Sequence, residues 1–322
     1  MVLVSVVMCV YNVEDYIEQC ITSVLNQTFK NFEFIIVNDG STDNTKKIIE
    51  KLKLKDSRIK LINNPKNLGI GKSRNITLQH AKGKYISIID GDDSYLSQKI
   101  QKQVAYLEKN EEVFLVASGV FLINEENKVL TKVKQITNPN KLKLKLLKKN
   151  TIFHSSVMYR NKDVFYREKL APAEDYDFYL RLLRENKKIR ILNEALVKYR
   201  IRKNSASFSK MAIQKLLANK ALEFYYEYLK FKTDSYNTFD FSSIYSINIT
   251  KSTNKIVLEC NIKSNFILFN FKKVKKYSKI YFKKYGYFNK FFIYYLASFF
   301  PIKLIQFSIK LFPIKILRYL NS

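Results

Sequence analysis

The sequence contains few cysteines, which argues against a disulfide framework and against a zinc site. Cys9, Cys20 and Cys260 are the three cysteines among 322 residues, and they form no close pair and no Cys/His spacing suited to zinc. We therefore expect neither a disulfide framework nor a zinc site, and we expect a reducing, cytoplasmic setting. Cys9 falls in an apolar run and Cys20 on the apolar face of a predicted helix, so both are interpreted as buried thiols.

Long apolar segments are also missing. No uncharged run, Phe291 to Ile302 included, approaches the roughly 20 residues that a transmembrane helix needs. The apolar run from Val2 to Val10 has no basic residue before it and leads directly into Asn12 and Glu14, which is not the pattern of a signal peptide. We therefore expect a chain that begins with its fold and does not span a bilayer.

Acidic residues are scarce relative to basic ones. The chain has 28 Asp and Glu against 57 Lys and Arg, a formal charge of +29, and after Glu259 it has 13 Lys or Arg and no acidic residue. This balance favours polyanionic partners such as nucleic acid, phosphorylated metabolites or anionic lipid headgroups, and charge alone does not choose among them. The length and the 47% of hydrophobic residues predict one large globular domain and a smaller part.

Strand-like and helix-like segments alternate through the first half of the chain, and the pattern becomes less regular after residue 110. The expected strands are 2–10, 32–37, 59–63, 85–89, 113–123, 151–159 and 189–200. The expected helices are 13–25, 44–54, 70–81, 98–110, 141–149 and 174–186. Asn12 is the expected N-cap of the first helix. Such alternation predicts an α/β fold with a doubly wound, mostly parallel sheet and flanking helices.

Polar clusters follow three of the expected strands. They are Tyr11–Asn12, 38–43 and 90–94. Because ligands of such sheets bind beyond the carboxyl ends of the strands, we expect the three clusters to meet at one crevice.

The cluster Asp90, Asp92 and Asp93 is the densest of the three. Two carboxylates 4 Å apart repel by about 4 kcal/mol at an effective dielectric of about 20, and a bound cation would relieve this. Mg²⁺ and Mn²⁺ prefer such hard oxygen ligands, often shared with the phosphates of a nucleotide. The alternative is a polar turn before the next helix.

Three further positions are candidate functional residues. Asp39, at a strand tip, is expected to point its carboxylate toward the crevice and to accept hydrogen bonds from a nucleobase or ribose. A turn and a helix N-cap explain the residues after it, Gly40, Thr42 and Asp43. Arg74, near the start of a helix, either binds phosphate or is solvated. Glu174 and Asp175, at another helix start, either act in general-base catalysis or complement the helix dipole.

Five blocks occur in order along the chain. They are VSVVMCVYN (4–12), FIIVNDGST (34–42), NLGIGKSRN (67–75), YISIIDGDD (85–93) and AEDYDFYLRL (173–182). Together they resemble family 2 glycosyltransferases, over about residues 1–207 if Tyr199-Arg200 and 205–207 are counted as the family's final motif. The resemblance implies a GT-A fold for a catalytic domain at 1–210, with a nucleotide-binding half at 1–110 and an acceptor-binding half at 111–210. Residues 211–322 are then a basic, aromatic-rich helical extension.

The resemblance also implies roles on the donor side. Tyr11 would lie against the base beside Asn12, Asp39 would hydrogen-bond the base, and Arg74 would lie near the diphosphate. Asp90 would be the first acid of the family's DxD motif, Asp92 would contact ribose or the metal, and Asp93 would ligate the metal, either Mn²⁺ or Mg²⁺. Which of these three aspartates contacts the metal stays open.

On the acceptor side, the resemblance implies that Asp175, in the Glu174-Asp175 motif, is the base of an inverting transfer. Many relatives have His where this chain has Arg202, and Arg cannot ligate a metal. Arg202 is therefore expected to pair with the diphosphate, with a weaker dependence on metal. His154 either faces the acceptor cleft or is a satisfied core histidine.

The extension from Phe266 to Tyr319 interleaves Lys with aromatic and aliphatic residues. Three interpretations stay open: amphipathic helices on anionic lipid, including Phe291–Phe300 and Leu304–Leu317; helices packed on the catalytic domain; and a nucleic-acid surface.

The favoured function is transfer of a sugar from a nucleotide sugar, expected to be a UDP-sugar, to a glycan or lipid-linked glycan. The expected setting is surface polysaccharide or lipooligosaccharide assembly at the inner face of the cell membrane, with no nucleic acid bound. A nucleic-acid-binding protein and a nucleotidyltransferase are the alternatives.

Overall fold

The computed structural model describes residues 2–162, 164–202, 211–267, 270–286 and 291–300. Contacts divide the chain into two compact units, residues 1–201 with 221–236 and residues 202–220 with 237–322. The helix α8 (Met211–Phe231) contributes to both. This division differs from the boundary predicted near residue 210, because 221–236 belong with the first unit.

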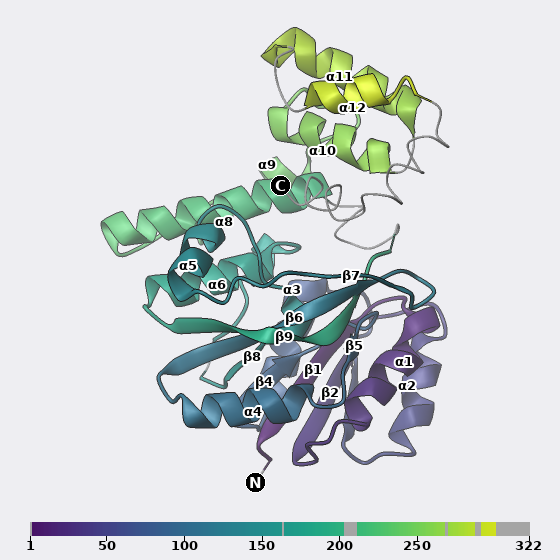
Figure 1. The fold of residues 1–322 in the computed structure, drawn as a ribbon, viewed down its shortest axis with the longest axis vertical. Helices are drawn as coiled ribbons and strands as arrows, with labels where there is room; N and C mark the ends of the chain where they lie inside the picture. The colour runs from purple at the N-terminus through teal and green to yellow at the C-terminus, as the bar shows by residue number, and fades with distance from the viewer. Residues whose placement is uncertain (1, 163, 203–210, 268–269, 287–290, 301–322) are drawn as a thin grey trace. The chain divides into compact units, whose positions relative to one another are not determined.

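The first unit is built on one nine-stranded sheet (Figure 1). The order is β3-β2-β1-β4-β8-β6-β9-β5, with β7 paired to β6. The strands are β1 (Val4–Val10), β2 (Phe32–Asn38), β3 (Ile59–Asn63), β4 (Tyr85–Ile88), β5 (Ser94–Tyr95), β6 (Val113–Ile123), β7 (Val129–Lys132), β8 (Met158–Arg160) and β9 (Lys188–Arg200). Strands β1 to β4 pair in parallel, β4 pairs antiparallel with β8, and β6 pairs in parallel with β9. The predicted α/β fold is confirmed, and β1 to β4, from the first half of the chain, form its continuous parallel part.

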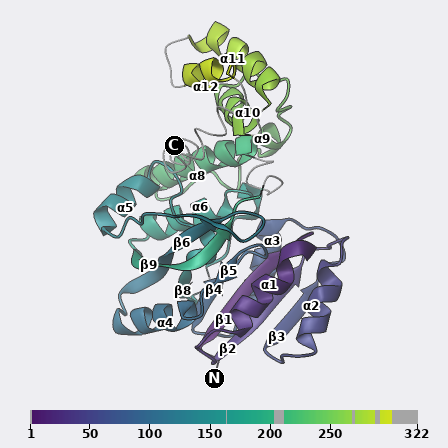
Figure 2. The ribbon, with the colours of Figure 1, turned by 45° about the vertical axis from the view of Figure 1, so that its right-hand side comes forward.

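Helices cover both faces of this sheet (Figures 1 and 2). They are α1 (Glu14–Leu25), α2 (Thr45–Lys53), α3 (Ile70–His80), α4 (Lys99–Lys109), α5 (Pro139–Leu146) and α6 (Glu174–Arg184). Val7 of β1 belongs to a buried cluster with Phe178 of α6, whereas Met8, the next residue, contacts Cys20 of α1. Since neighbouring strand residues point to opposite faces, α1 and α6 lie on opposite sides of the sheet.

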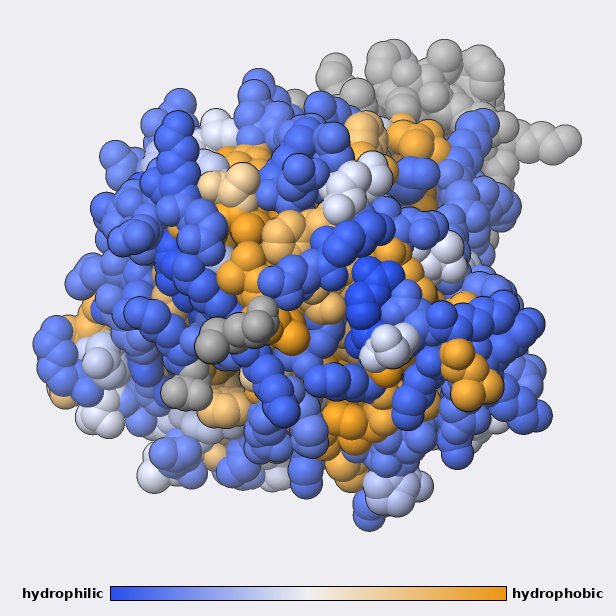
Figure 3. Space-filling model, turned by 90° about the horizontal axis from the view of Figure 1, so that it is seen from below, coloured by the Kyte–Doolittle hydropathy of each residue, from blue (hydrophilic) through white to orange (hydrophobic). Residues whose placement is uncertain are grey.

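Hydrophilic side chains dominate the face shown in Figure 3, with apolar groups among them.

Two local predictions were wrong. Asn12 is not the N-cap of α1, because the helix begins at Glu14 and Asn12 has a positive φ of 52°. Its side chain instead bonds Thr42, with Oδ1 accepting from the Thr42 amide at 2.9 Å. Residues 151–159 are not one strand: a 3₁₀ turn, η1 (His154–Ser156), precedes β8. Ser156 closes that turn by donating its amide hydrogen to the Phe153 carbonyl.

Gly91 allows the acidic loop to approach β1 closely. A Cβ at this position would lie 2.6 Å from Cγ1 of Val10 and 3.2 Å from Cγ2 of Val13. The first distance is well inside van der Waals contact, so a side chain here would force the loop or the strand to shift. The glycine therefore fixes how closely Asp90 and Asp92 lie to the end of β1.

The second unit is helical in its described residues. Besides the start of α8 it holds α9 (Ser242–Tyr245), α10 (Lys255–Ile267), α11 (Phe271–Tyr285) and α12 (Phe291–Ala297). Leu258, Tyr281 and Phe291 are among the buried residues of the cluster that joins the last three helices. Within the described ranges, no helix combines the length and the apolar character needed to cross a bilayer. The predicted segment Leu304–Leu317 lies outside the described residues.

Candidate active site

The polar clusters predicted at strand ends do meet at one edge of the sheet. Because β1, β2 and β4 are parallel neighbours, Tyr11, Asp39 and Asp90 all follow carboxyl ends on the same side. The Asp39 amide donates to the Val10 carbonyl at 2.8 Å, which continues the pairing of β1 and β2 to the edge. The structure thus brings the predicted donor-side residues together.

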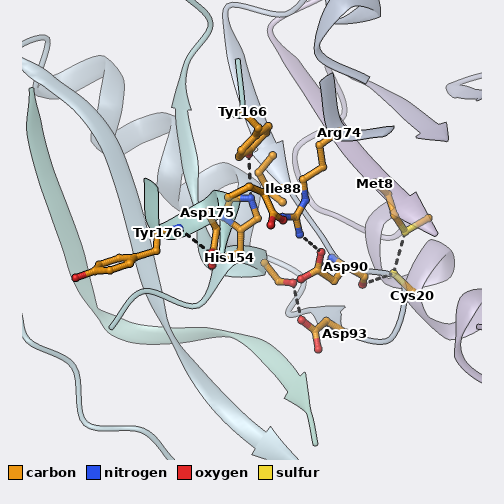
Figure 4. A network of polar contacts seen from close by, with 12 residues as sticks. Met8, Cys20, Arg74, Ile88, Asp90, Asp93, His154, Tyr166, Asp175 and Tyr176 are labelled. Carbon is orange, nitrogen blue, oxygen red and sulfur yellow. Dashed lines mark hydrogen bonds and ion pairs between the residues drawn. The ribbon is translucent and has the colours of Figure 1, made fainter. Parts of the chain in front are cut away.

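Arg74 connects this edge to α6. Its guanidinium donates to Asp90 Oδ1 at 2.9 Å and also to Oε1 of Glu174 (Figure 4). The exposed fractions are 6% for Arg74 and 2% for Glu174, so this ion pair is buried. Burial raises the pKa of the Glu174 carboxyl, and the charge of Arg74 opposes that rise. Arg74, predicted to lie near a diphosphate, is therefore held between two carboxylates.

Asp39 organises the loop before α3. Its Oδ1 accepts from Asn64 Nδ2 and from the Leu68 amide, each at 2.8 Å, and its Oδ2 accepts from the Gly69 amide at 3.0 Å. The residue is 3% exposed. Asp39 therefore fixes the loop at residues 64–69, and a contact between Asp39 and a nucleobase stays a prediction.

Asp93 is the most enclosed member of the acidic cluster. It is 2% exposed, and its two oxygens accept hydrogen bonds from the Ser155 hydroxyl and the Arg200 amide. Burial, followed by the charges of Asp92 and Asp90, raises the pKa of the Asp93 carboxyl well above its usual range. Asp92, in contrast, is partly exposed.

These carboxylates fit a divalent cation that is shared with a ligand. Their mutual repulsion is the kind that a cation relieves, and their oxygens are the hard donors that Mg²⁺ and Mn²⁺ prefer. Among the residues that the structure describes, no group of three or more His, Cys, Asp or Glu is arranged to hold a metal alone. Ligand phosphates would have to complete the coordination, and Asp92 is more accessible to them than Asp93.

Asp175 is a second acidic centre, one residue beyond the start of α6. Its Oδ2 accepts from Asn150 Nδ2 at 2.8 Å and its Oδ1 from the Tyr176 amide at 2.7 Å. Burial, together with the neighbouring charge of Glu174, raises the pKa of Asp175 to about 7. A carboxylate with such a pKa can take a proton at neutral pH, which is the property that general-base catalysis needs.

His154 is a core residue. It is 6% exposed, and its two ring nitrogens bond the hydroxyls of Tyr179 and Tyr166 at 2.7 and 2.9 Å (Figure 4). Burial lowers the pKa of the imidazole well below its usual value. The cleft-facing alternative is therefore wrong, because the ring has no nitrogen left to offer a ligand.

The other predicted residues differ in how the structure places them. Tyr11 is 46% exposed at the strand edge, where a flat ligand can reach its ring. Asn12 joins the end of β1 to the loop after β2 through its bonds to Thr42. Arg202 is the first residue of the second unit, and its role toward a diphosphate stays a prediction.

Sequence reasoning missed the residues that hold the two acidic centres in place. Ser155 donates to Asp93 and accepts from the Asp90 amide at 3.0 Å, and Asn150 donates to Asp175. Arg200 stood in a recognised motif without an assigned role. Of these three residues, Arg200 stands at a strand end, Ser155 lies in η1 and Asn150 in the loop after α5, and none of these positions identifies the residue's partner from sequence.

Comparison with known proteins places this site in a family. Residues 5–167 match the profile described as glycosyl transferase family 2. An uncharacterized glycosyltransferase of Methanocaldococcus jannaschii is 40% identical over 224 residues, which cover 66% of this chain and 76% of that protein. The Escherichia coli protein WfaP, named as a UDP-Glc:α-D-GlcNAc-diphosphoundecaprenol β-1,3-glucosyltransferase, is 36% identical over 65% of this chain and 82% of its own length.

A solved structure shares the fold. The crystal structure of S. aureus TarS residues 1–349 in complex with UDP-GlcNAc aligns with a TM-score of 0.55 and 19% sequence identity. The alignment covers 92% of this chain and 89% of that one.

Replacing Arg74 tests how far the fold depends on its ion pairs. We expect Arg74→Met to lower the free energy of unfolding by about 3–5 kcal/mol, because it leaves Asp90 and buried Glu174 without their counter-charge. Lys84→Met, which breaks an exposed pair with Glu108, is the control and should change little. Chemical denaturation of both variants gives the comparison. Equal losses would contradict a special role for the Arg74 pairs.

Proposed function

The chain belongs to glycosyl transferase family 2, and we propose that it transfers a sugar from a UDP-sugar to a hydroxyl of a lipid-linked glycan. It is a glycosyltransferase that uses a nucleotide sugar and inverts the anomeric centre. The choice of UDP and of a lipid-linked acceptor is supported by the name of the relative WfaP. The observation that carries the catalytic part is the pair of acidic centres, Asp90 to Asp93 at the strand edge and Asp175 on α6.

Asp175 is the base in this proposal. Its carboxylate takes the proton of the acceptor hydroxyl while that oxygen attacks the anomeric carbon from the face opposite the leaving nucleotide. The bond from the anomeric carbon to the diphosphate breaks as the new glycosidic bond forms, so the configuration inverts. Asn150 and the Tyr176 amide orient the carboxylate, and burial together with the charge of Glu174 raises the pKa of Asp175 to about 7. Base catalysis of this kind contributes about 10²- to 10⁴-fold.

The acidic loop holds the donor in this proposal. Asp92 and Asp93 would hold a divalent cation, Mn²⁺ or Mg²⁺, together with the phosphates of the nucleotide. When bound, the cation stabilises the negative charge of the departing diphosphate. Tyr11 offers an exposed ring to the base, and Asp39 accepts a hydrogen bond from the base beside its bonds to the 64–69 loop.

The second unit docks on an anionic membrane in this proposal. Five large apolar side chains on α12 and in the three residues after it are 38–59% exposed. They are Phe292, Ile293, Leu296, Phe299 and Phe300. The ammonium group of Lys275 on α11 lies 3.9 Å from the centroid of the Phe299 ring. An apolar helix face bordered by lysines fits the interface of anionic lipid, where a lipid-linked acceptor would be found.

A donor panel tests the proposed function. Purified protein is incubated with UDP-, GDP-, CMP- and dTDP-sugars, with Mn²⁺, Mg²⁺ or chelator, and nucleotide release and transfer are measured. We expect turnover with a UDP-sugar, reduced by chelator because the acidic loop then loses its cation. Turnover with another nucleotide alone would reject the choice of UDP, and no turnover with any donor would reject the enzyme site as described.

The pH dependence tests Asp175. Because the carboxylate must be ionised to act and its pKa is about 7, kcat should fall about tenfold per pH unit below that value. Asn150→Ala removes a hydrogen bond to the ionised form, so the acid limb should move to higher pH. Asp175→Asn should lose transfer by at least 10²-fold and keep UDP binding. A flat profile between pH 5 and 8 would refute the assignment.

Vesicle binding tests the membrane surface. We expect the double variant Phe299→Ser/Phe300→Ser to reduce co-sedimentation with phosphatidylglycerol vesicles several-fold, because it removes apolar area from the exposed face. Phe231→Ser, at a 61% exposed position of α8, is the control. Binding should weaken at high salt, because exposed charges are then screened. Equal binding of all three proteins would reject this surface.

A further inference from the structure

Arg200, the last residue of β9, holds the acidic loop through two hydrogen bonds. Its amide donates to Asp93 Oδ1 and its Nε donates to the Asp92 carbonyl, each at 2.8 Å. The residue is 3% exposed. Arg200 thus contacts the loop at two successive residues, and it meets Asp92 through the backbone and not through the carboxylate.

The remaining guanidinium donors reach two other parts of the first unit. Nη1 donates to two carbonyls of the β6–β7 turn, and Nη2 donates to one amide side chain on α1 and one in that turn. These acceptors are the carbonyls of Asn124 and Glu125, both at 3.0 Å, Gln19 Oε1 at 2.9 Å and Asn127 Oδ1 at 2.7 Å. The guanidinium carbon also lies 4.7 Å from the ring centroid of Tyr16 on α1. One side chain therefore joins the acidic loop, α1 and the β6–β7 turn.

All five guanidinium N–H groups are used, and all five acceptors are neutral oxygens. This differs from Arg74, whose two partners are carboxylates. Every N–H group of the Arg200 guanidinium has a hydrogen-bond acceptor, and no carboxylate of the described residues lies within ion-pair distance of it. Its positive charge consequently acts on whatever anionic groups lie near the loop, beginning with Asp92 and Asp93.

We propose that Arg200 is a positioning residue for donor binding. It fixes the backbone at Asp92 and Asp93, and from neutral acceptors it supplies a positive charge that favours a nucleoside diphosphate at the loop. This inference rests on the proposed function, because it assigns the loop to the donor. The role needs both the hydrogen bonds and a positive charge whose guanidinium donates to no carboxylate.

The first test measures binding without turnover. Titration calorimetry follows UDP binding to the full chain in the presence of Mn²⁺, and Mn²⁺ binding alone is followed by electron paramagnetic resonance. We expect Arg200→Lys to weaken UDP binding about tenfold, because lysine keeps the charge but cannot make the same five bonds. Arg190→Lys, on the same strand, is the control, since Arg190 bonds the carbonyl of its neighbour Ile189. Equal affinities for the wild type and the Arg200→Lys variant would overturn the positioning role.

The second test separates charge from tethering and avoids a loss of folding. Gln19→Glu and Asn127→Asp keep an oxygen acceptor at exposed positions but convert it to a carboxylate, which neutralises Arg200. We expect each to weaken UDP binding about threefold, with melting temperatures unchanged. Gln101→Glu adds the same charge at an exposed position of α4 and should have no effect. Unchanged binding in both Arg200-facing variants would overturn the contribution of the charge.

The outcome for the wild type separates this inference from its premise. A wild-type chain that binds UDP, with variants that bind it equally well, would overturn the role of Arg200 and keep the donor site. A wild-type chain that binds no nucleoside diphosphate, with or without Mn²⁺, would overturn both.

Discussion

The buried ion pairs of Arg74 are the interaction on which the rest of the active site depends. They join the end of β4, through Asp90, to the start of α6, through Glu174. Arg74 and Glu174 are buried and Asp90 is partly exposed. Burying charged groups is costly, and their mutual attraction offsets that cost only while the partners are present. The same contact sets the surroundings of Asp175: burial raises the pKa of this carboxyl most, the adjacent carboxyl of Glu174 raises it further, and the charge of Arg74 opposes the rise. The strand edge that carries Asp90 and the proposed base Asp175 therefore belong to one electrostatic unit.

The two buried arginines at the site differ in the groups that their guanidinium N–H groups bond. Arg74 neutralises acids that the fold has brought together, and it adds little net charge to the crevice. The guanidinium of Arg200 donates to neutral oxygens, so no carboxylate accepts a hydrogen bond from it. In a crevice that holds several aspartates and is proposed to receive a diphosphate, this distribution reduces repulsion of the ligand without removing the carboxylates that a cation needs.

Much of the fold could be predicted from the sequence, because the spacing of apolar residues along the chain indicates the strands and helices. The alternation of buried strands and amphipathic helices up to residue 110 was predicted to within about two residues, and it placed Asp39 and Asp90 at one edge. Predictions failed where a partner distant in sequence decides the structure. His154 is a core residue because two tyrosines saturate it, and 151–159 is broken because the serines of η1 turn toward Asp93 and Phe153. The partners of Arg200 are spread from residue 19 to residue 127, and no local pattern marks them.

The discontinuity of the first unit limits how this protein can be divided or recombined. The chain leaves that unit after residue 201 and returns at residues 221–236. There Asp234 accepts hydrogen bonds from Arg167 and Arg184, both from the segment around α6. A chain ending at residue 210 would remove Asp234 from both guanidinium groups, so Arg184 of α6 would lose this ion pair and Arg167 would keep its pair with Asp177. Exchange of C-terminal regions between relatives is therefore compatible with this fold only at junctions beyond residue 236, even though the recognised family motifs end some thirty residues earlier.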